Sequence, residues 1–297
     1  MNPPLCLQDN LVKGANTPAH GKCVFAPVFL KGLIILARFC SLFSSSNGNS
    51  IFVGTSEGSV LIDAGVSAKR IDAALEGIGE SPENIRAVFV THEHSDHISG
   101  LAAFALKHGI KVYCSKGTYK ALSSKKGYEK VDFCLIDKNS TQCAGMNITP
   151  FHTAHDCLEG LGYVIETPDD RKIAIATDLG NFTDEIKEAV TGCDLVYIES
   201  NFDLNMLKNG PYPYFLKQRI LSKHGHLSND ECAAAASFLM QNGTTRFVLG
   251  HLSEKNNLPS LAMNTTLSSL TEIGGICGKD FTLDVSPRLS PLKKILF

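Results

Sequence analysis

This sequence of 297 residues has almost no net charge, no closely spaced cysteine pairs and no long uninterrupted apolar run. Its 28 Lys and Arg residues nearly balance its 30 Asp and Glu residues, which gives a formal net charge of -2. Bulk charge therefore gives no evidence for binding to nucleic acid. Any contact with a polyanion has to come from a local basic patch.

Cysteine pairs of the CxxC type are absent, although the chain contains ten cysteines. The cysteines are scattered, and several lie in apolar runs, where we expect small buried side chains. A chain of this length can bury most of its apolar surface and needs no disulfide to fold. We therefore expect free thiols and a location in the reducing cytoplasm.

The sequence also lacks an uninterrupted apolar segment. Its longest apolar run, residues 24–43, is broken by Pro27, Lys31, Gly32 and Arg38. A membrane-spanning helix needs about 20 mostly apolar residues, and a signal peptide needs an early apolar stretch with a small-residue cleavage site. The sequence therefore predicts no membrane span and no signal peptide.

The chain beyond its first residues alternates short strand-like and helix-like segments. Residues 1–31 contain four prolines without periodicity and are predicted to form a poorly ordered extension. Strand-rich stretches with helices then occur near 33–165 and 166–291, with no linker between them. One domain over residues 32–297, with two packed sheets and outer helices, fits this pattern better than two domains.

Hydrophobic patterning and turn residues predict the individual elements. Strands are expected over residues 33–37, 51–53, 59–63, 87–91, 111–114, 148–151, 162–167, 172–176, 195–199 and 246–250. The second and third of these form a hairpin after a polar loop over 44–50. Helices are expected over residues 67–78, 98–108, 184–190, 229–240 and after Leu258. Asn229 is the candidate N-cap of the helix over 229–240.

The most informative segment is Thr91-His92-Glu93-His94-Ser95-Asp96-His97, which directly follows an apolar strand. In an extended turn residues i and i+2 face the same way, so His92 and His94 can bind one ion together. The chain then turns into a helix, which directs Asp96 and His97 toward a second ion. A His-rich polar surface loop is the alternative, but such crowding is unfavourable without a metal because competing groups are desolvated together.

A hydrolytic metal site needs three or four ligands per ion, an open position for water and, for two ions, an anionic bridge. His155, Asp178 and His251 each follow a predicted strand, where α/β folds gather their sites. His152 lies in the same segment as His155 and is an alternative to it. Each of these residues alone is more often structural, so their order along the chain carries the argument.

This ordered set resembles the five motifs of the metallo-β-lactamase superfamily over about residues 33–291. The resemblance rests on these residues of the sequence: Asp63 in Leu61-Ile62-Asp63-Ala64-Gly65, the motif at 91–97, His155, Asp178 and His251. It implies an α/β fold of the αββα sandwich type, with two mixed β-sheets flanked by helices.

The resemblance also implies two sets of metal ligands: His92, His94 and His155 for a first divalent ion, and Asp96, His97 and His251 for a second. Asp178 would bridge the ions, and a bridging hydroxide would be the nucleophile. His155 is preferred over His152 because the family ligand is normally followed by a small or acidic residue. Asp63 would orient the motif loop from behind the ligands. His-rich ligation with two carboxylates suits zinc, with manganese or iron as alternatives.

Two further segments narrow the reaction, because metals alone do not identify a substrate. Glu199 ends a predicted strand, and His226 precedes a predicted helix. They resemble the Glu and His elements of the phosphodiesterase branch, which includes tRNase Z. The resemblance implies that Glu199 orients His226 and that His226 protonates the leaving alcohol. The catalytic candidates are thus Asp96, Glu199 and His226, and the alternative is a purely structural His226.

Together with the Ser-rich segment 44–50 and residues 216–229, these motifs are similar to the YycJ/VicX-like group of the superfamily. Ser45 and Asn47 depart from that group's usual glycine and serine. Members of the group are regarded as cytoplasmic hydrolases with nuclease activity, including exonuclease action on DNA. The resemblance therefore implies a nucleic acid or another phosphodiester as the substrate.

Basic and aromatic side chains lie close to the second of these segments. Lys208, Lys217, Arg219 and Lys223 are candidates to contact backbone phosphates. Tyr212, Tyr214 and Phe215 are candidates to stack on bases. The alternative is a solvated charged helix with aromatic residues that anchor a loop.

The sequence thus predicts a dinuclear metal-dependent hydrolase, with a phosphodiesterase or nuclease as the first reading. A thioester or lactone hydrolase of the same fold would use the same metals but would not need Glu199 and His226. A non-enzymatic metal-binding or regulatory protein would require missing ligands, whereas all seven ligand positions are filled. The oligomeric state is left open.

Overall fold

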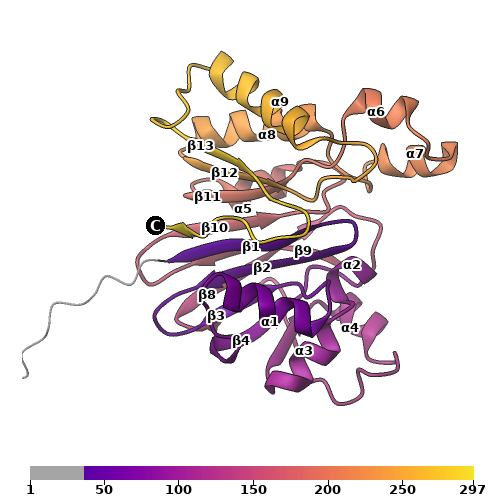
Figure 1. The fold of residues 1–297 in the computed structure, drawn as a ribbon, viewed down its shortest axis with the longest axis vertical. Coiled ribbons are helices and arrows are strands. Elements are labelled where there is room, and N and C mark those ends of the chain that lie inside the picture. Colours follow the sequence, from indigo (N-terminus) through magenta and orange to yellow (C-terminus); the bar gives the residue numbers. More distant parts are fainter. Residues whose placement is uncertain (1–36) are drawn as a thin grey trace, which may run out of the picture. The chain divides into compact units, whose positions relative to one another are not determined.

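The computed structural model describes residues 37–297. The predicted extension over 1–31, the domain boundary at residue 32 and nearly all of the predicted strand over 33–37 lie outside these residues. Within them, two seven-stranded β-sheets pack face to face, and helices cover both outer faces (Figure 1). The predicted αββα sandwich is confirmed.

The first sheet combines the early strands with a short strand near the C-terminus. In spatial order its strands are β14 (Ile295–Leu296), β1 (Arg38–Ser45), β2 (Gly48–Gly54), β3 (Ser59–Ile62), β4 (Ile85–Phe89), β5 (Lys111–Cys114) and β6 (Phe133–Leu135). Neighbours from β14 to β3 are antiparallel, and neighbours from β3 to β6 are parallel. The sheet is therefore mixed, and β2 and β3 form the predicted hairpin.

The second sheet has the same mixture of directions. In spatial order its strands are β13 (Thr282–Val285), β12 (Arg246–Gly250), β11 (Leu195–Glu199), β10 (Lys172–Ala176), β9 (Gly160–Glu166), β8 (Met146–Thr153) and β7 (Thr141–Cys143). Neighbours from β13 to β10 are parallel, and neighbours from β10 to β7 are antiparallel.

The chain passes from the first sheet to the second well before residue 165, where the two strand-rich stretches of the sequence meet. The chain leaves the first sheet after Leu135 and enters the second at Thr141. Residues 167–171 connect β9 to its neighbour β10, since Glu166 pairs with Lys172 across them. A polar turn inside a hairpin and a polar boundary between two sheets have the same composition, so the sequence pattern did not separate them.

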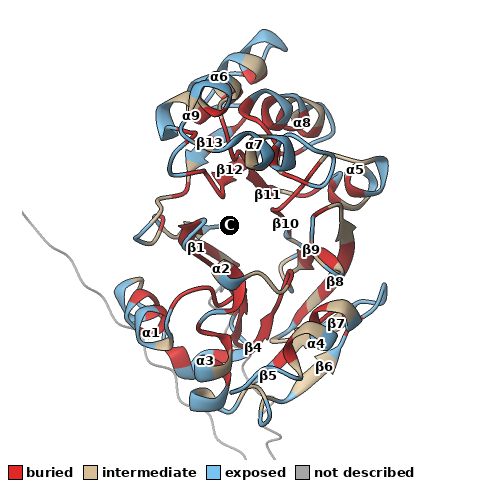
Figure 2. Cartoon of the chain, turned by 90° about the vertical axis from the view of Figure 1, so that its right-hand side faces the viewer, coloured by how far each residue is buried: buried red, intermediate tan, exposed pale blue. Residues whose placement is uncertain are grey.

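Helices occupy the two outer layers. Those of the first sheet are α1 (Ala68–Gly77), the 3-10 turn η1 (Pro82–Asn84), α2 (Ser95–Ile98), α3 (Leu101–His108) and α4 (Lys116–Leu122). Those of the second part of the chain are α5 (Asp184–Val190), α6 (Leu204–Asn209), α7 (Tyr214–Ile220), α8 (Asn229–Gln241) and α9 (Pro259–Glu272). Figure 2 shows that the strands are mainly buried and that the helices expose their outer sides.

Strand β10 illustrates why the sheets form the centre of the molecule. Ile173 and Ile175 pack into the core between the two sheets, whereas Ala174 and Ala176 pack under the helices of the second layer. Successive side chains of a strand point to opposite faces, so a strand covered on both faces is apolar throughout. The same reason explains the uninterrupted apolar runs of β11 and β12, whose residues are buried except for Arg246.

Three local predictions need correction. The loop predicted over 44–50 is a turn at residues 46 and 47 between the ends of β1 and β2. The helix predicted over 98–108 is split between α2 and α3 at Gly100, where an added Cβ would lie 1.8 Å from the Val66 carbonyl oxygen. The N-cap of α8 is Ser228, not Asn229, because the Ser228 hydroxyl accepts from the amide of Glu231 in a capping box.

Two further expectations concern cysteines and membranes. The eight cysteines among the described residues are free, and Cys40, Cys114, Cys193 and Cys232 are buried. None of the helices in residues 37–297 is long and apolar enough to cross a membrane.

Candidate metal centre and active site

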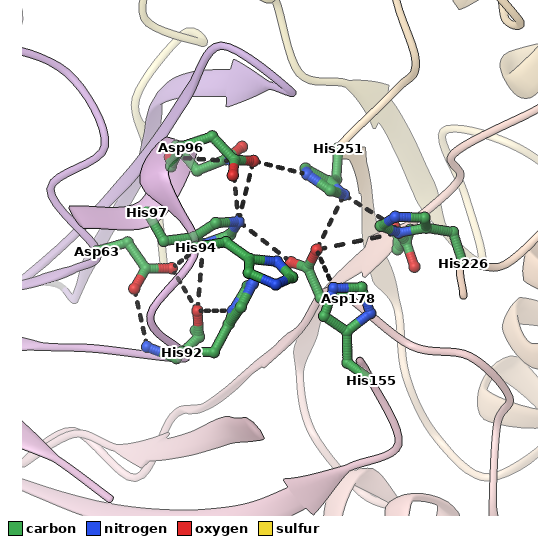
Figure 3. A network of polar contacts seen from close by, with 12 residues as sticks. Asp63, His92, His94, Asp96, His97, His155, Asp178, His226 and His251 are labelled. Atoms are coloured by element: carbon green, nitrogen blue, oxygen red, sulfur yellow. Dashed lines mark hydrogen bonds and ion pairs between the residues drawn. The ribbon is translucent and has the colours of Figure 1, made fainter. Parts of the chain in front are cut away.

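The candidate site lies where strands of both sheets end. Asp63 follows β3, and the motif at 91–97 follows β4. From the second sheet, Asp178 follows β10, Glu199 ends β11 and His251 follows β12. Figure 3 shows that the labelled side chains point toward one another from these strand ends. The fold therefore brings together residues that lie far apart in the sequence, from Asp63 to His251, at the ends of the strands.

The backbone at three of these strand ends is left-handed. Asp63, Asp178 and His251 have φ angles of 64°, 57° and 54°, and they are three of the five non-glycine residues with positive φ in the described part of the chain. Such residues cluster at functional sites, where surrounding contacts hold an unfavourable conformation. Here the sharp change of direction turns each side chain into the site directly after a buried strand.

The predicted ligands form two adjacent groups. The ligand atoms of His92, His94 and His155 lie within 4.8 Å of one another, and so do those of Asp96, His97 and His251. Asp178 stands between the two groups. Its Oδ1 lies 3.7 Å from His155 Nε2, and its Oδ2 lies 3.4 Å from His97 Nε2. The structure thus brings together all seven residues that the sequence singled out as ligands.

Asp63 supports the motif loop from below, as expected. Its Oδ1 accepts from the Thr91 amide at 2.8 Å, and its Oδ2 accepts from the Thr91 hydroxyl at 2.8 Å. The same Oδ2 accepts from His97 Nδ1 at 2.7 Å, which leaves His97 Nε2 facing the ligand cluster. A carboxylate behind a histidine fixes both its tautomer and its ring orientation.

The other histidines are oriented in the same way. His155 Nδ1 donates to the Gly225 carbonyl at 3.0 Å, and His251 Nδ1 donates to Glu199 Oε1 at 2.8 Å. His226 Nδ1 donates to this same Glu199 oxygen at 2.6 Å. Glu199 Oε2 accepts from the amides of Leu179 and Leu227. Glu199 therefore holds one predicted ligand and the predicted acid in fixed positions.

The cluster fits divalent cations, as shown by its unpartnered atoms. His92 Nε2 and Asp178 Oδ2 are buried and have no hydrogen-bond partner. Buried polar atoms without a partner are unfavourable, so they point to a ligand that belongs between them. Neutral imidazole nitrogens and carboxylate oxygens are the donors that zinc and similar ions prefer. The described residues can therefore hold metal ions.

Burial and neighbouring charges shift the pKa values of several residues of the cluster. Burial lowers the pKa of His92 and His155 and favours their neutral, metal-binding form. Burial alone would also lower the pKa of His97 and His251, but nearby carboxylates, Asp178 foremost, raise it well above its usual range. For Asp178, burial would raise the pKa, but the surrounding histidines hold it well below its usual range.

His152, the alternative to His155, does not join the cluster. It lies within β8 and lines a separate cavity with Phe151 and Glu159. His155 comes after the end of β8, in the connection to β9, and its side chain is buried against Asp178. Of the two histidines in this segment, the structure therefore places His155 beside the other candidate ligands.

Sequence reasoning missed several polar residues that hold the ligands. Asn49 Nδ2 lies 3.1 Å from both Asp96 Oδ2 and His97 Nε2. Asn201 Nδ2 donates to the His251 carbonyl at 2.8 Å, and the His251 amide donates to Ser44 Oγ at 2.8 Å. Ser44 and Asn49 belong to the Ser-rich segment, and Asn201 follows Glu199, so the motifs contained these residues but gave no indication of their contacts.

A small cavity opens next to His226. It has a volume of about 200 Å³ and is lined by residues that include Asp156, Asn201, Tyr212, Arg219 and His226. Arg219 forms an ion pair with Asp156, the residue directly after His155. Tyr212 and Arg219, which the sequence suggested as substrate contacts, thus lie beside the candidate site.

Comparison with known proteins is consistent with this geometry. Residues 59–252 match the model of the beta-lactamase superfamily domain. The chain is 37% identical over 264 residues to exodeoxyribonuclease WalJ of Streptococcus pneumoniae, which covers 87% of this chain and 98% of the relative. The chain belongs to the beta-lactamase superfamily. The predicted family, its YycJ-like group and the class of metal-dependent hydrolases with this fold are confirmed.

The chain is also similar to a second curated relative and to a solved structure. It is 34% identical over 255 residues to exodeoxyribonuclease YycJ of Bacillus anthracis, with 85% of this chain and 96% of the relative covered. The metallo-beta-lactamase fold protein YhfI from Bacillus subtilis superposes with a TM-score of 0.63 at 14% identity, over 86% of this chain and 99% of that structure. The second similarity concerns the fold alone.

Proposed function

We propose that this protein is a dinuclear metal-dependent nuclease that hydrolyses phosphodiester bonds of DNA. The observation that carries the proposal is the 2.6 Å contact between Glu199 and His226, next to the ligand cluster. Glu199 also orients the predicted ligand His251, but the two predicted ligand sets do not include His226. Expulsion of an alcohol from phosphorus requires a proton donor, which His226 can supply. Relatives that carry the name exodeoxyribonuclease support DNA as the substrate and exonuclease action.

In this proposal the ligand cluster holds two divalent ions, with zinc as the first candidate and manganese or iron as alternatives. The first ion would be held by His92, His94 and His155, and the second by Asp96, His97 and His251, with Asp178 shared between them. Bound ions of this kind acidify water and stabilise negative charge on a phosphoryl group. Elemental analysis of the purified protein tests the identity and number of the ions.

His226 suits the role of general acid because of its position and its partner. Its Nδ1 donates to Glu199, so its Nε2 is the atom left to donate a proton to a leaving oxygen. Its side chain is 19% exposed, whereas that of Glu199 is fully buried. Substrate can therefore reach His226 but not Glu199. Burial would raise the pKa of Glu199, but the charges of His226 and His251 lower it to about 2, so Glu199 stays ionised and accepts from His226.

The test compares two diesters that differ in leaving group. DNA releases a sugar alkoxide, which needs a proton, whereas bis(p-nitrophenyl) phosphate releases a stable phenolate. We expect His226→Ala to lower the rate on DNA by about 10²- to 10⁴-fold and to leave the activated diester nearly unaffected. His224→Ala, an exposed histidine two positions earlier, is the matched control and should retain both activities.

Equal losses on both diesters would show that His226 acts in binding or folding and not as an acid. A wild-type protein that cleaves a thioester or lactone but neither diester would overturn the nuclease proposal in favour of the other hydrolase class. The cytoplasmic location inferred from the sequence stays a prediction, and detection of the protein in a fractionated cell extract tests it.

A further inference from the structure

The segment from α6 to His226 forms a small helical cap beside the site. The cap has its own apolar cluster, in which Phe202, Leu207 and Ile220 are buried. It is fixed against the site at several points. The Gly225 carbonyl holds His155, and a Cβ added at Gly180 would lie 2.0 Å from the Lys223 carbonyl oxygen. The cap therefore keeps a defined position next to the ligand cluster.

The cavity between the cap and the site is small. Pockets that enclose whole small molecules usually measure about 300–1,000 Å³, whereas this one measures about 200 Å³. Its size suits one unit of a longer substrate whose remainder lies outside. Arg219 and His226 line the same cavity, so a substrate that extends out of it on the Arg219 side comes next to α7.

The cap is basic in a chain that is slightly acidic overall. Residues 204–226 contain Lys208, Lys217, Arg219 and Lys223 and no Asp or Glu. Arg219 is paired with Asp156, but its side chain is still 53% exposed. A guanidinium group has five N–H donors, so Arg219 can keep this pair and also contact a phosphate. The local charge of the cap thus complements a polyanion.

Two neighbouring aromatic residues of α7 are unusually exposed, Tyr214 at 77% and Phe215 at 74%. They lie on different faces of the helix. Leu216 and Ile220 face the cap's apolar cluster. Residues i and i+4 share a helix face, so Phe215 lies on the same face as Arg219, and about 6 Å along the helix axis separates them. Tyr214, which the sequence also suggested as a base contact, shares its face with Gln218 and not with Arg219, so it is not expected to stack on the same strand.

We propose that the Phe215–Arg219 face of α7 binds the single-stranded stretch of DNA next to the scissile bond. Phe215 stacks on an unpaired base, and Arg219 contacts the phosphate one step nearer the metal cluster. The proposal rests on the proposed nuclease function and adds which part of the DNA the α7 face contacts. Stacking on an exposed ring needs an unpaired base and tolerates any sequence.

The test measures binding of a phosphorothioate oligodeoxynucleotide, which resists hydrolysis, to the metal-loaded protein. We expect Phe215→Ala to weaken binding of the single strand by roughly 5- to 100-fold. Phe215→Trp should restore it, and Tyr214→Ala, an equally exposed aromatic on another face, should leave it unchanged. Binding of a blunt duplex and hydrolysis of bis(p-nitrophenyl) phosphate should be the same in all variants.

Equal binding of the single strand by wild type and Phe215→Ala would overturn the proposal, and so would equal losses in Phe215→Ala and Tyr214→Ala. A change from dimer to monomer in Phe215→Ala, seen by sedimentation, would assign the face to a second copy of the chain instead. The two proposals fail separately. DNA hydrolysis that does not depend on Phe215 refutes only the proposed role of the Phe215–Arg219 face. Phe215-dependent binding without any DNA hydrolysis refutes only the proposed nuclease activity.

Discussion

At the scale of single residues, the left-handed backbone at Asp63, Asp178 and His251 is the feature that most clearly separates the site from its surroundings. Asp tolerates this conformation better than most residues, whereas for His251 it is unfavourable. The contacts of His251 explain how it persists. Its amide donates to Ser44, and its carbonyl accepts from Asn201, so both sides of the strained peptide are held by buried side chains.

Asp63 allows the hydrogen-bonding role of a carboxylate to be separated from its backbone role. Asn also tolerates left-handed φ, so Asp63→Asn keeps the turn, but its amide nitrogen must face at least one of the donors from Thr91 and His97. We expect metal affinity to fall by about 10- to 100-fold because His97 loses its fixed orientation. Competition with a chromophoric chelator measures this change.

Asp170→Asn is the matched control for this experiment. Asp170 has a φ of 58° and lies in the turn between β9 and β10, where it is not part of the ligand cluster. Its substitution should leave metal affinity unchanged. Unchanged affinity in Asp63→Asn as well would show that the carboxylate does not position His97.

At the scale of elements, the loop after β3 is wedged against the motif loop. A Cβ added at Gly65 would lie 1.7 Å from the Asp96 carbonyl oxygen, although the φ of Gly65 is accessible to other residues. We expect Gly65→Ala to destabilise the fold by about 2–3 kcal/mol and to lower Tm by about 4–12 °C, because backbone must move. Metal affinity should fall with it, since Asp96 is displaced. Thermal unfolding and chelator competition measure both effects.

Gly77→Ala provides the opposite case. Gly77 ends α1, its φ is not left-handed, and an added Cβ would meet no atom within 4 Å. The substitution should stabilise the protein by about 0.5–1 kcal/mol through reduced freedom of the unfolded chain. Similar Tm values for the two variants would contradict the steric argument at Gly65.

The elements also show what the sequence can and cannot predict. Strands β5, β10, β11 and β12 have the predicted bounds, because they are apolar runs between clear turn residues. Strands β6 and β7 have three residues each and carry no periodicity. The cap of α8 was misplaced by one residue even though the Ser228–Glu231 pattern of a capping box was present.

The same contrast holds for the site. The motif at 91–97 is contiguous, so its spacing alone predicted a metal centre. His155 could be preferred over His152 only through the family pattern, because both lie near the same strand end. The contact of Asn49 with Asp96 depends on the register of β1 and β2. The orientation of His155 depends on a hydrogen bond to the carbonyl of Gly225, which is 70 positions away in the sequence. Neither is encoded in the type of residue at a position.

At the scale of the whole molecule, the candidate centre joins the two sheets. His92, His94, Asp96 and His97 come from the first sheet, whereas His155, Asp178 and His251 come from the second. Bound ions would therefore hold the two sheets together, and we expect a chelator to lower the Tm of the metal-loaded protein. An ion present at about 1,000 times its Kd adds about 4 kcal/mol of stability, which corresponds to about 8–16 °C in Tm for a domain of this size.

The Tm difference between the metal-loaded and the metal-free protein should also grow as pH rises from about 6 to about 8. In the metal-free state carboxylates raise the pKa of His97 and His251. The stability that these protonated histidines contribute is present at low pH and is lost as pH rises through their folded-state pKa. Metal binding has to displace the same protons, so it strengthens over the same range. Calorimetric scans with chelator or with excess zinc at several pH values test this. A Tm difference that shrinks as pH rises would show that metal binding does not displace protons from His97 and His251.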